Sequence, residues 1–114
     1  MSAFGDGLDQ EEPNAAERAT LRIRDLIWLE EIVEKLWTKH HVDTSEVREV
    51  VVGGPRFRFV EKGHRRGEDV YAALGRTGAG RYLTVFLVLK RKGEALVISA
   101  RDMTTSERKR YEQG

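Results

Sequence analysis

The segment 82–89 constrains the fold of this chain most strongly, because it is apolar on both faces. It reads Tyr-Leu-Thr-Val-Phe-Leu-Val-Leu. Successive side chains of a strand point to opposite sides of the sheet, so this pattern places apolar groups on each side. It predicts a central strand covered on both faces. With 114 residues in all, the chain is expected to build one domain around that strand.

Alternating apolar residues predict further strands. We expect them near Ile23–Trp28, Arg56–Val60, Asp69–Thr77 and Ala95–Ala100. The Thr-Gly-Ala-Gly sequence at 77–80 predicts a hairpin turn before the central strand. The surrounding segment 75–81 is similar to a phosphate-binding loop, but that loop needs a lysine that opens a helix, whereas a strand follows here. The hairpin is therefore the preferred interpretation.

Helical periodicity appears in three segments. Apolar residues at 29, 32, 33, 36 and 37 predict a helix that ends near His40. Asp43 or Thr44 caps a second, short helix that stops before Pro55. Thr104 and Glu107 form a capping box for a last helix over 105–113. The order of strand, two helices, four strands and helix predicts an α+β domain with a mostly antiparallel sheet.

The net charge of +1 conceals a strong asymmetry along the chain. Residues 56–114 hold fourteen basic and seven acidic residues, whereas residues 1–20 hold one basic and five acidic residues. We expect residues 1–20 to be a disordered acidic leader and residues 21–114 to be the folded domain. The basic half is a candidate surface for a polyanion, although a solvated, charge-rich surface explains the charge equally well.

Composition excludes several classes of protein. The chain has no cysteine, so it has no disulfide and no thiolate metal site. No apolar run approaches the roughly 20 residues of a membrane helix, and the start lacks the features of a signal peptide, which predicts a cytoplasmic protein. His40 and His41 are adjacent and would point apart on a helix, so no metal site is expected. His40 is either an imidazole at the edge of the core or a proton-transfer group.

The end of the chain groups residue types that suit phosphodiester chemistry. Arg101 ends a strand just before the last helix, on which Glu107 and Tyr111 lie about one turn apart. Arg76 ends another strand, and an arginine presents a rigid fork of donors that fits a phosphate. Each residue also has an ordinary explanation as a surface cation, a helix cap or a packing ring. From the residues alone both interpretations stay open.

The blocks that carry these residues resemble the BrnT family, the ribonuclease toxins of bacterial type II toxin–antitoxin pairs. The resemblance covers roughly residues 23–112. It rests on Lys39-His40 followed by Val42, on the segments 69–77, 80–85 and 98–101, and on Glu107-Arg108 with Tyr111-Glu112. The chain departs from the family pattern at Leu36, His41 and Met103, where the family usually has Asn, Gly and Ala.

This resemblance implies a RelE-like α+β fold and a metal-independent endoribonuclease without cofactors that inhibits translation. It implies attack of a ribose 2′-hydroxyl on the adjacent phosphate, with Arg101 and Arg76 on that phosphate. His40, Glu107 and Tyr111 are then the proton-transfer candidates. Lys39, Arg108 and Arg110 would hold flanking phosphates of the RNA, an attraction that weakens with salt.

The resemblance also implies a protein partner. The expected partner is an antitoxin similar to BrnA, a ribbon-helix-helix protein that masks the toxin, and the pair would reach operator DNA only through that antitoxin. The departures at Leu36, His41 and Met103 motivate an alternative, a catalytically inactive module that binds an antitoxin or nucleic acid. A DNA-binding regulator ranks last, because Glu46 and Glu49 on the second helix are poor neighbours for phosphate.

Overall fold

The computed structural model describes residues 23–63, 68–90 and 93–113. The elements in chain order are β2 (Asp25–Ile27), α2 (Glu30–His40), α3 (Thr44–Val52), β3 (Arg56–Glu61), β4 (Val70–Arg76), β5 (Tyr82–Leu89), β6 (Glu94–Asp102) and α4 (Thr105–Gln113). The predicted α+β order is confirmed. The acidic leader predicted for residues 1–20 lies outside the described residues.

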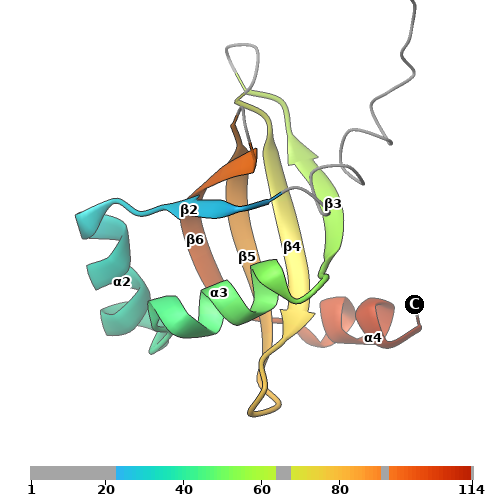
Figure 1. The fold of residues 1–114 in the computed structure, drawn as a ribbon. Coiled ribbons are helices and arrows are strands. Elements are labelled where there is room, and N and C mark those ends of the chain that lie inside the picture. Colours follow the sequence, from blue (N-terminus) through green and yellow to red (C-terminus); the bar gives the residue numbers. More distant parts are fainter. Residues whose placement is uncertain (1–22, 64–67, 91–92, 114) are drawn as a thin grey trace, which may run out of the picture.

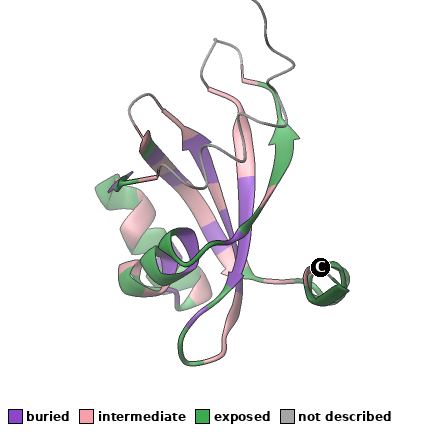
Figure 2. Ribbon diagram, turned by 45° about the vertical axis from the view of Figure 1, so that its right-hand side comes forward, coloured by how far each residue is buried: buried purple, intermediate pink, exposed green. Residues whose placement is uncertain are grey.

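The described strands form one sheet in the order β2-β6-β5-β4-β3. Only β2 and β6 run parallel, and the other neighbours are antiparallel. The predicted central strand is therefore confirmed as β5, which has two strands on each side. Figure 1 shows α2 and α3 crossing one face of this sheet, and Figure 2 shows α4 on the opposite side.

The hydrophobic core lies between the sheet and the pair α2–α3. From the helical side and the connection between the helices come Leu36, Val42, Val47, Val50 and Val51, and from the sheet come Leu83, Val85, Leu87, Ala95, Val97 and Ala100. All of these side chains are buried. Burial of such apolar groups stabilises the fold in proportion to the area removed from water.

An irregularity in β6 determines which of its residues face away from the helices. Phe86 pairs with Ser99, whereas the next residue, Leu87, pairs with Val97. Ile98 is thus an extra residue in β6, and an extra residue shifts the alternation of the strand. As a result both Val97 and Ala100 enter the core, while Arg101 faces the other side.

The predicted capping box of Thr104 and Glu107 is present, and of the two predicted caps of α3 the structure has Asp43, which also forms a capping box. Asp43 accepts the backbone N–H of Glu46, and the Glu46 carboxylate accepts the backbone N–H of Asp43. Thr104 and Glu107 make the same reciprocal pair at the start of α4. The Thr77–Gly80 turn also forms as predicted, with the Thr77 N–H donating to the Arg81 carbonyl.

Candidate functional site

Several arginines gather on the sheet face that α2 and α3 leave uncovered. Arg76 pairs directly with Tyr82, and Thr84 pairs directly with Arg101. Paired residues share a face, and so do residues two apart on one strand, so all four side chains point to the same side of the sheet. We call this surface, completed by α4, the arginine face; it comprises Arg56, Arg58, Arg76, Arg101 and Arg108 with the rings of Tyr82, Phe86 and Tyr111.

Glu107 organises the centre of the arginine face. Its two carboxylate oxygens accept hydrogen bonds from Arg101 Nη1 at 2.7 Å and Nη2 at 2.9 Å. The hydroxyl of Thr84, which is fully buried, donates to Glu107 Oε1 at 2.9 Å. Arg58 Nη2 lies 3.7 Å from Oε2. Glu107 therefore joins α4 to β5 and β6 and reaches toward β3.

These contacts change how Glu107 ionises. The hydrogen bonds from Arg101, with help from the Thr104 N–H and the Thr84 hydroxyl, lower the pKa of Glu107 from 4.5 to about 2. Glu107 in turn raises the pKa of Arg101 above its ordinary value. At neutral pH Glu107 is ionised and has no proton to donate. Its two hydrogen bonds with Arg101 fix the orientation of that guanidinium.

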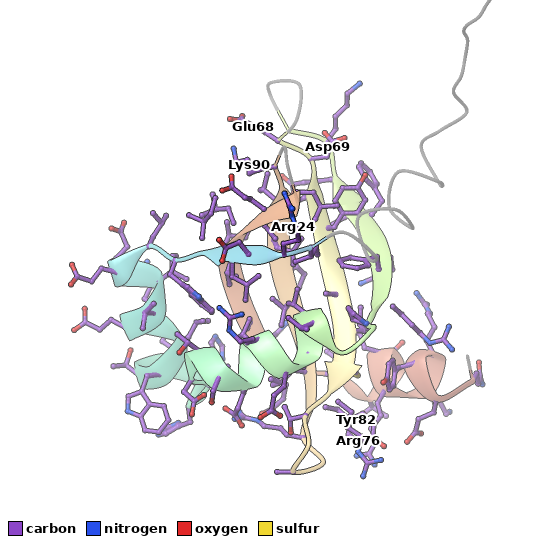
Figure 3. All side chains as sticks on the ribbon, viewed as in Figure 1. Arg24, Glu68, Asp69, Arg76, Tyr82 and Lys90 are labelled. Atoms are coloured by element: carbon purple, nitrogen blue, oxygen red, sulfur yellow. The ribbon has the colours of Figure 1, made fainter. Side chains whose placement is uncertain are left out.

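A second group of contacts is centred on the ring of Tyr82. The guanidinium carbon of Arg108 lies 4.0 Å from the Tyr82 ring centre, and that of Arg76 lies 5.1 Å away. The Tyr111 ring meets Tyr82 edge-on at 6.0 Å between centroids. Figure 3 shows Arg76 and Tyr82 together at the α4 end of the sheet, far from Asp69 and Lys90 at the other end.

The remaining contacts extend the arginine face to both sides of this centre. The guanidinium carbon of Arg56 lies 5.9 Å from the centre of the Tyr111 ring, and that of Arg101 lies 5.2 Å from the centre of the Phe86 ring. A guanidinium over an aromatic ring is held electrostatically and keeps N–H donors for other groups. The result is a surface of oriented cations and half-buried rings.

The structure brings together some of the predicted site residues and separates others. Arg76, Arg101, Glu107, Tyr111 and Arg108 all belong to the arginine face. Arg110 is exposed on α4. Lys39 and His40 lie on α2, on the other side of the sheet, and the carbonyl of His40 accepts a hydrogen bond from Arg81 Nη2 at 2.8 Å.

Sequence reasoning missed Arg56, Arg58, Tyr82 and Phe86. The strict alternation Arg-Phe-Arg-Phe over 56–59 was a usable signal, because it places both arginines on one face of an edge strand. Nothing in the sequence showed that this face is the one that α4 completes. That pairing depends on the sheet order and on the extra residue in β6.

The arrangement suits an anionic, partly aromatic ligand. Fixed guanidinium groups can bind phosphates, and the rings offer stacking surfaces for bases. Among the described residues, no group of histidines, aspartates and glutamates is arranged to hold a metal ion. The described helices include none long and apolar enough to cross a membrane.

Comparisons with known proteins agree with this fold. A family model described as the ribonuclease toxin BrnT of type II toxin–antitoxin systems matches residues 28–107. The crystal structure of the Brucella abortus ribonuclease toxin BrnT has a similar fold, with a TM-score of 0.52 and 17% sequence identity over 71% of this chain and 97% of that chain. No curated protein sequence gives a significant match. Because the family model spans most of the folded part, the chain belongs to the BrnT family of type II toxin–antitoxin ribonuclease toxins.

Proposed function

We propose that this chain is a metal-independent endoribonuclease that cleaves RNA on the arginine face and thereby inhibits translation. The observation that carries the proposal is that Arg76 and Arg101 lie on the same sheet face, on the strands β4 and β6 that flank β5, beside Tyr82 and α4. In-line attack of a 2′-hydroxyl on phosphorus builds negative charge on the phosphate oxygens. Fixed cations at that position stabilise this charge with little reorganisation.

Arg101 and Arg76 are proposed to bind the reacting phosphate. Arg101 is held by Glu107, so its orientation is set before RNA arrives, which lowers the entropic cost of binding. Tyr111 is the proton-transfer candidate that shares this face. Glu107 acts through Arg101 as a positioning residue. Lys39 and His40 lie on α2, across the sheet, and are not assigned to this step.

The same face is proposed to hold single-stranded RNA. Tyr82, Phe86 and Tyr111 supply rings on which bases can stack, and Arg56, Arg58 and Arg108 supply charge for flanking phosphates. Arg110, exposed on α4, adds to this charge. Stacking requires unpaired bases, so a duplex should be a poor substrate.

The decisive experiment incubates the purified protein with a labelled single-stranded RNA in excess EDTA. We expect cleavage that leaves a 2′,3′-cyclic phosphate, and no cleavage at a position where the substrate carries a single 2′-deoxy nucleotide. Arg101→Ala should lower the rate by about 100-fold or more. Arg48→Ala, which removes an exposed cation from α3 on the opposite side, is the matched control.

One observation favours a second candidate, a binding module without catalysis. Both terminal nitrogens of Arg101 already contact Glu107, so the strongest pair on the face is satisfied without a ligand. RNA retention without cleavage by the well-folded protein would support this module and exclude the nuclease. Cleavage that EDTA abolishes would exclude the metal-independent mechanism.

The family also bears on the partners. Type II toxin–antitoxin membership implies an antitoxin and an RNA substrate. We propose that the antitoxin is a ribbon-helix-helix protein similar to BrnA and that operator DNA is bound only through the complex. Co-expression with the neighbouring gene should relieve growth arrest, and a toxin chain alone should not bind operator DNA.

A further inference from the structure

β3 forms one edge of the sheet and is the most exposed of the described strands. β3 is last in the strand order, and its residues are exposed except for Phe57, which packs against the core. Phe59 is 54% exposed and Val60 38% exposed. In the part of the chain that the structure describes, no strand pairs with this edge. Figure 2 shows β3 largely in the colour of exposed residues.

The two faces of β3 differ sharply in chemistry. Arg56 and Arg58 point to the arginine face, where they approach Tyr111 and Glu107. Phe57 and Phe59 point to the other face, where Phe59 meets Tyr71 edge-on at 5.8 Å. A strand added at this edge would alternate in the same way, because pairing keeps neighbouring side chains on the same face.

We propose that the edge of β3 binds an extended segment of a partner protein whose acidic and apolar side chains alternate. On one face its acidic residues would pair with Arg56 and Arg58, and on the other its apolar residues would cover Phe57 and Phe59. Backbone hydrogen bonds would supply affinity, and the alternation would supply specificity. The proposal concerns binding alone and does not depend on RNA cleavage, although an occupied edge would neutralise two cations of the arginine face.

A second copy of this chain fits the edge poorly. A symmetric antiparallel pair of β3 strands centred on Phe57 places Arg56 opposite Arg58, and one centred on Arg58 places Arg58 opposite itself. Like charges directly opposite each other destabilise a strand pair. Further along, the register of β3 shifts between Phe59 and Glu61, which interrupts a regular edge.

The acidic residues 1–20 also lack the required pattern over a full strand. Asp9 and Glu11 are separated by Gln10 rather than by an apolar residue, Glu12 follows directly, and Pro13 comes next. Proline cannot donate a backbone hydrogen bond to a ladder. A segment of a separate protein is therefore the occupant that the chemistry of β3 favours.

The test measures binding of a fluorescent twelve-residue peptide of alternating Glu and Val to the full chain. A control peptide of the same composition arranges these residues in pairs, Glu-Glu-Val-Val. We expect the alternating peptide to bind at least about tenfold more tightly, since only its faces match those of β3. Equal binding of the two peptides would overturn the proposal.

Backbone methylation separates strand addition from simple charge attraction. In an added strand, only every second N–H points to the neighbouring strand. We expect N-methylation of either the Glu amides or the Val amides to weaken binding about tenfold or more, and methylation of the other set to have little effect. If both methylated peptides bind like the parent, strand addition is excluded.

Protein variants locate the site. Phe59→Thr, which keeps strand propensity, should weaken peptide binding several-fold, whereas Val52→Thr at a 60% exposed position on α3 should not. Loss of binding in both variants, or in neither, would place the peptide elsewhere.

Replacement of Asp9, Glu11 and Glu12 by their amides in the full chain should leave binding unchanged. A tenfold gain would show that the acidic leader is the occupant and would refute the partner proposal.

Discussion

Arg101 and Glu107 hold each other through two parallel hydrogen bonds, from Nη1 to Oε1 at 2.7 Å and from Nη2 to Oε2 at 2.9 Å. The same carboxylate accepts from the Thr104 N–H at the start of α4 and from the Thr84 hydroxyl on β5. One side chain thus caps a helix, attaches it to the sheet and orients a cation of the arginine face. Glu107 therefore serves both the attachment of α4 and the orientation of Arg101.

The first prediction concerns acid stability. The folded-state pKa of Glu107 is about 2, below its ordinary 4.5, so its contribution is complete above pH 4.5 and is lost as the pH falls toward 2. We expect a contribution of about 2 kcal/mol, less than the roughly 3 kcal/mol that the full shift would give, because Arg101 is 33% exposed and water screens the pair.

Urea unfolding of the protein and of Glu107→Gln between pH 6 and pH 2 measures this contribution. Over this range the free energy of unfolding of the parent should fall by about 2 kcal/mol more than that of Glu107→Gln. Parallel curves for the two proteins would mean that Glu107 titrates normally and that the pair with Arg101 is weak.

The second prediction concerns Arg81, which ties the hairpin to both helices. Its guanidinium donates to the carbonyls of His40 and His41, to Glu46 and to Asp102. The side chain is only 26% exposed. Arg81→Ala should lower the free energy of unfolding by about 2–3 kcal/mol, because it leaves several acceptors without their donor.

Lysine should not replace Arg81. An ammonium group cannot reproduce the fork that reaches two carbonyls and two carboxylates, so Arg81→Lys is expected to recover less than half of the loss. Arg48→Ala on the exposed side of α3 should change stability by less than about 0.5 kcal/mol. Chemical denaturation of the three variants makes the comparison, and a full recovery by lysine would contradict the network.

Much of the fold was accessible from the sequence, since hydrophobic period and caps act locally. The capping box of Asp43 and Glu46 and the two-sided apolar pattern of β5 each specify a structure from neighbouring residues alone. The position of the arginine face was not accessible. It depends on non-local pairing of β3 with β4, and on the extra residue Ile98, which sets the direction of Arg101.

The same distinction between local and non-local information explains which site residues were predicted correctly as neighbours. Arg101, Glu107 and Tyr111 are close in sequence, so helix spacing places them together. Lys39 entered only through the family resemblance, His40 was one of two alternatives from the residues alone, and the structure places both across the sheet. Tyr82 was counted as part of a covered strand face, because periodicity cannot tell a ring under a helix from a ring among guanidinium groups.

The third prediction concerns the end of α2. His41 has φ 54° and adopts the left-handed conformation that ends many helices, usually at a glycine. A side chain in this conformation costs about 1–2 kcal/mol. The edge contact of His41 with Trp37, at 5.4 Å between ring centroids, offsets part of this cost. His41→Gly should therefore raise the free energy of unfolding by up to about 1 kcal/mol.

The alanine variant is the matched control for His41. His41→Ala loses the contact with Trp37 but keeps a Cβ in the left-handed region, so it should be destabilising. Thermal unfolding at constant pH distinguishes the two. If glycine and alanine shift the midpoint in the same direction, the backbone conformation is not the source of the effect.

The last prediction concerns Tyr82 as a stacking surface for RNA. Its ring lies under the guanidinium groups of Arg76 and Arg108, and stacking of one base on such a ring contributes about 1–3 kcal/mol. Tyr82→Leu should weaken single-stranded RNA binding by roughly tenfold or more, whereas Tyr82→Phe, which loses only an exposed hydrogen bond to Glu112, should bind almost as the parent does. Trp37→Leu, which removes a 54% exposed ring from α2 across the sheet, is the control. Fluorescence anisotropy with a labelled oligonucleotide measures all four proteins well below their unfolding temperatures. Equal losses for Tyr82→Leu and Trp37→Leu would show that RNA does not use the arginine face, because only one of these rings belongs to it.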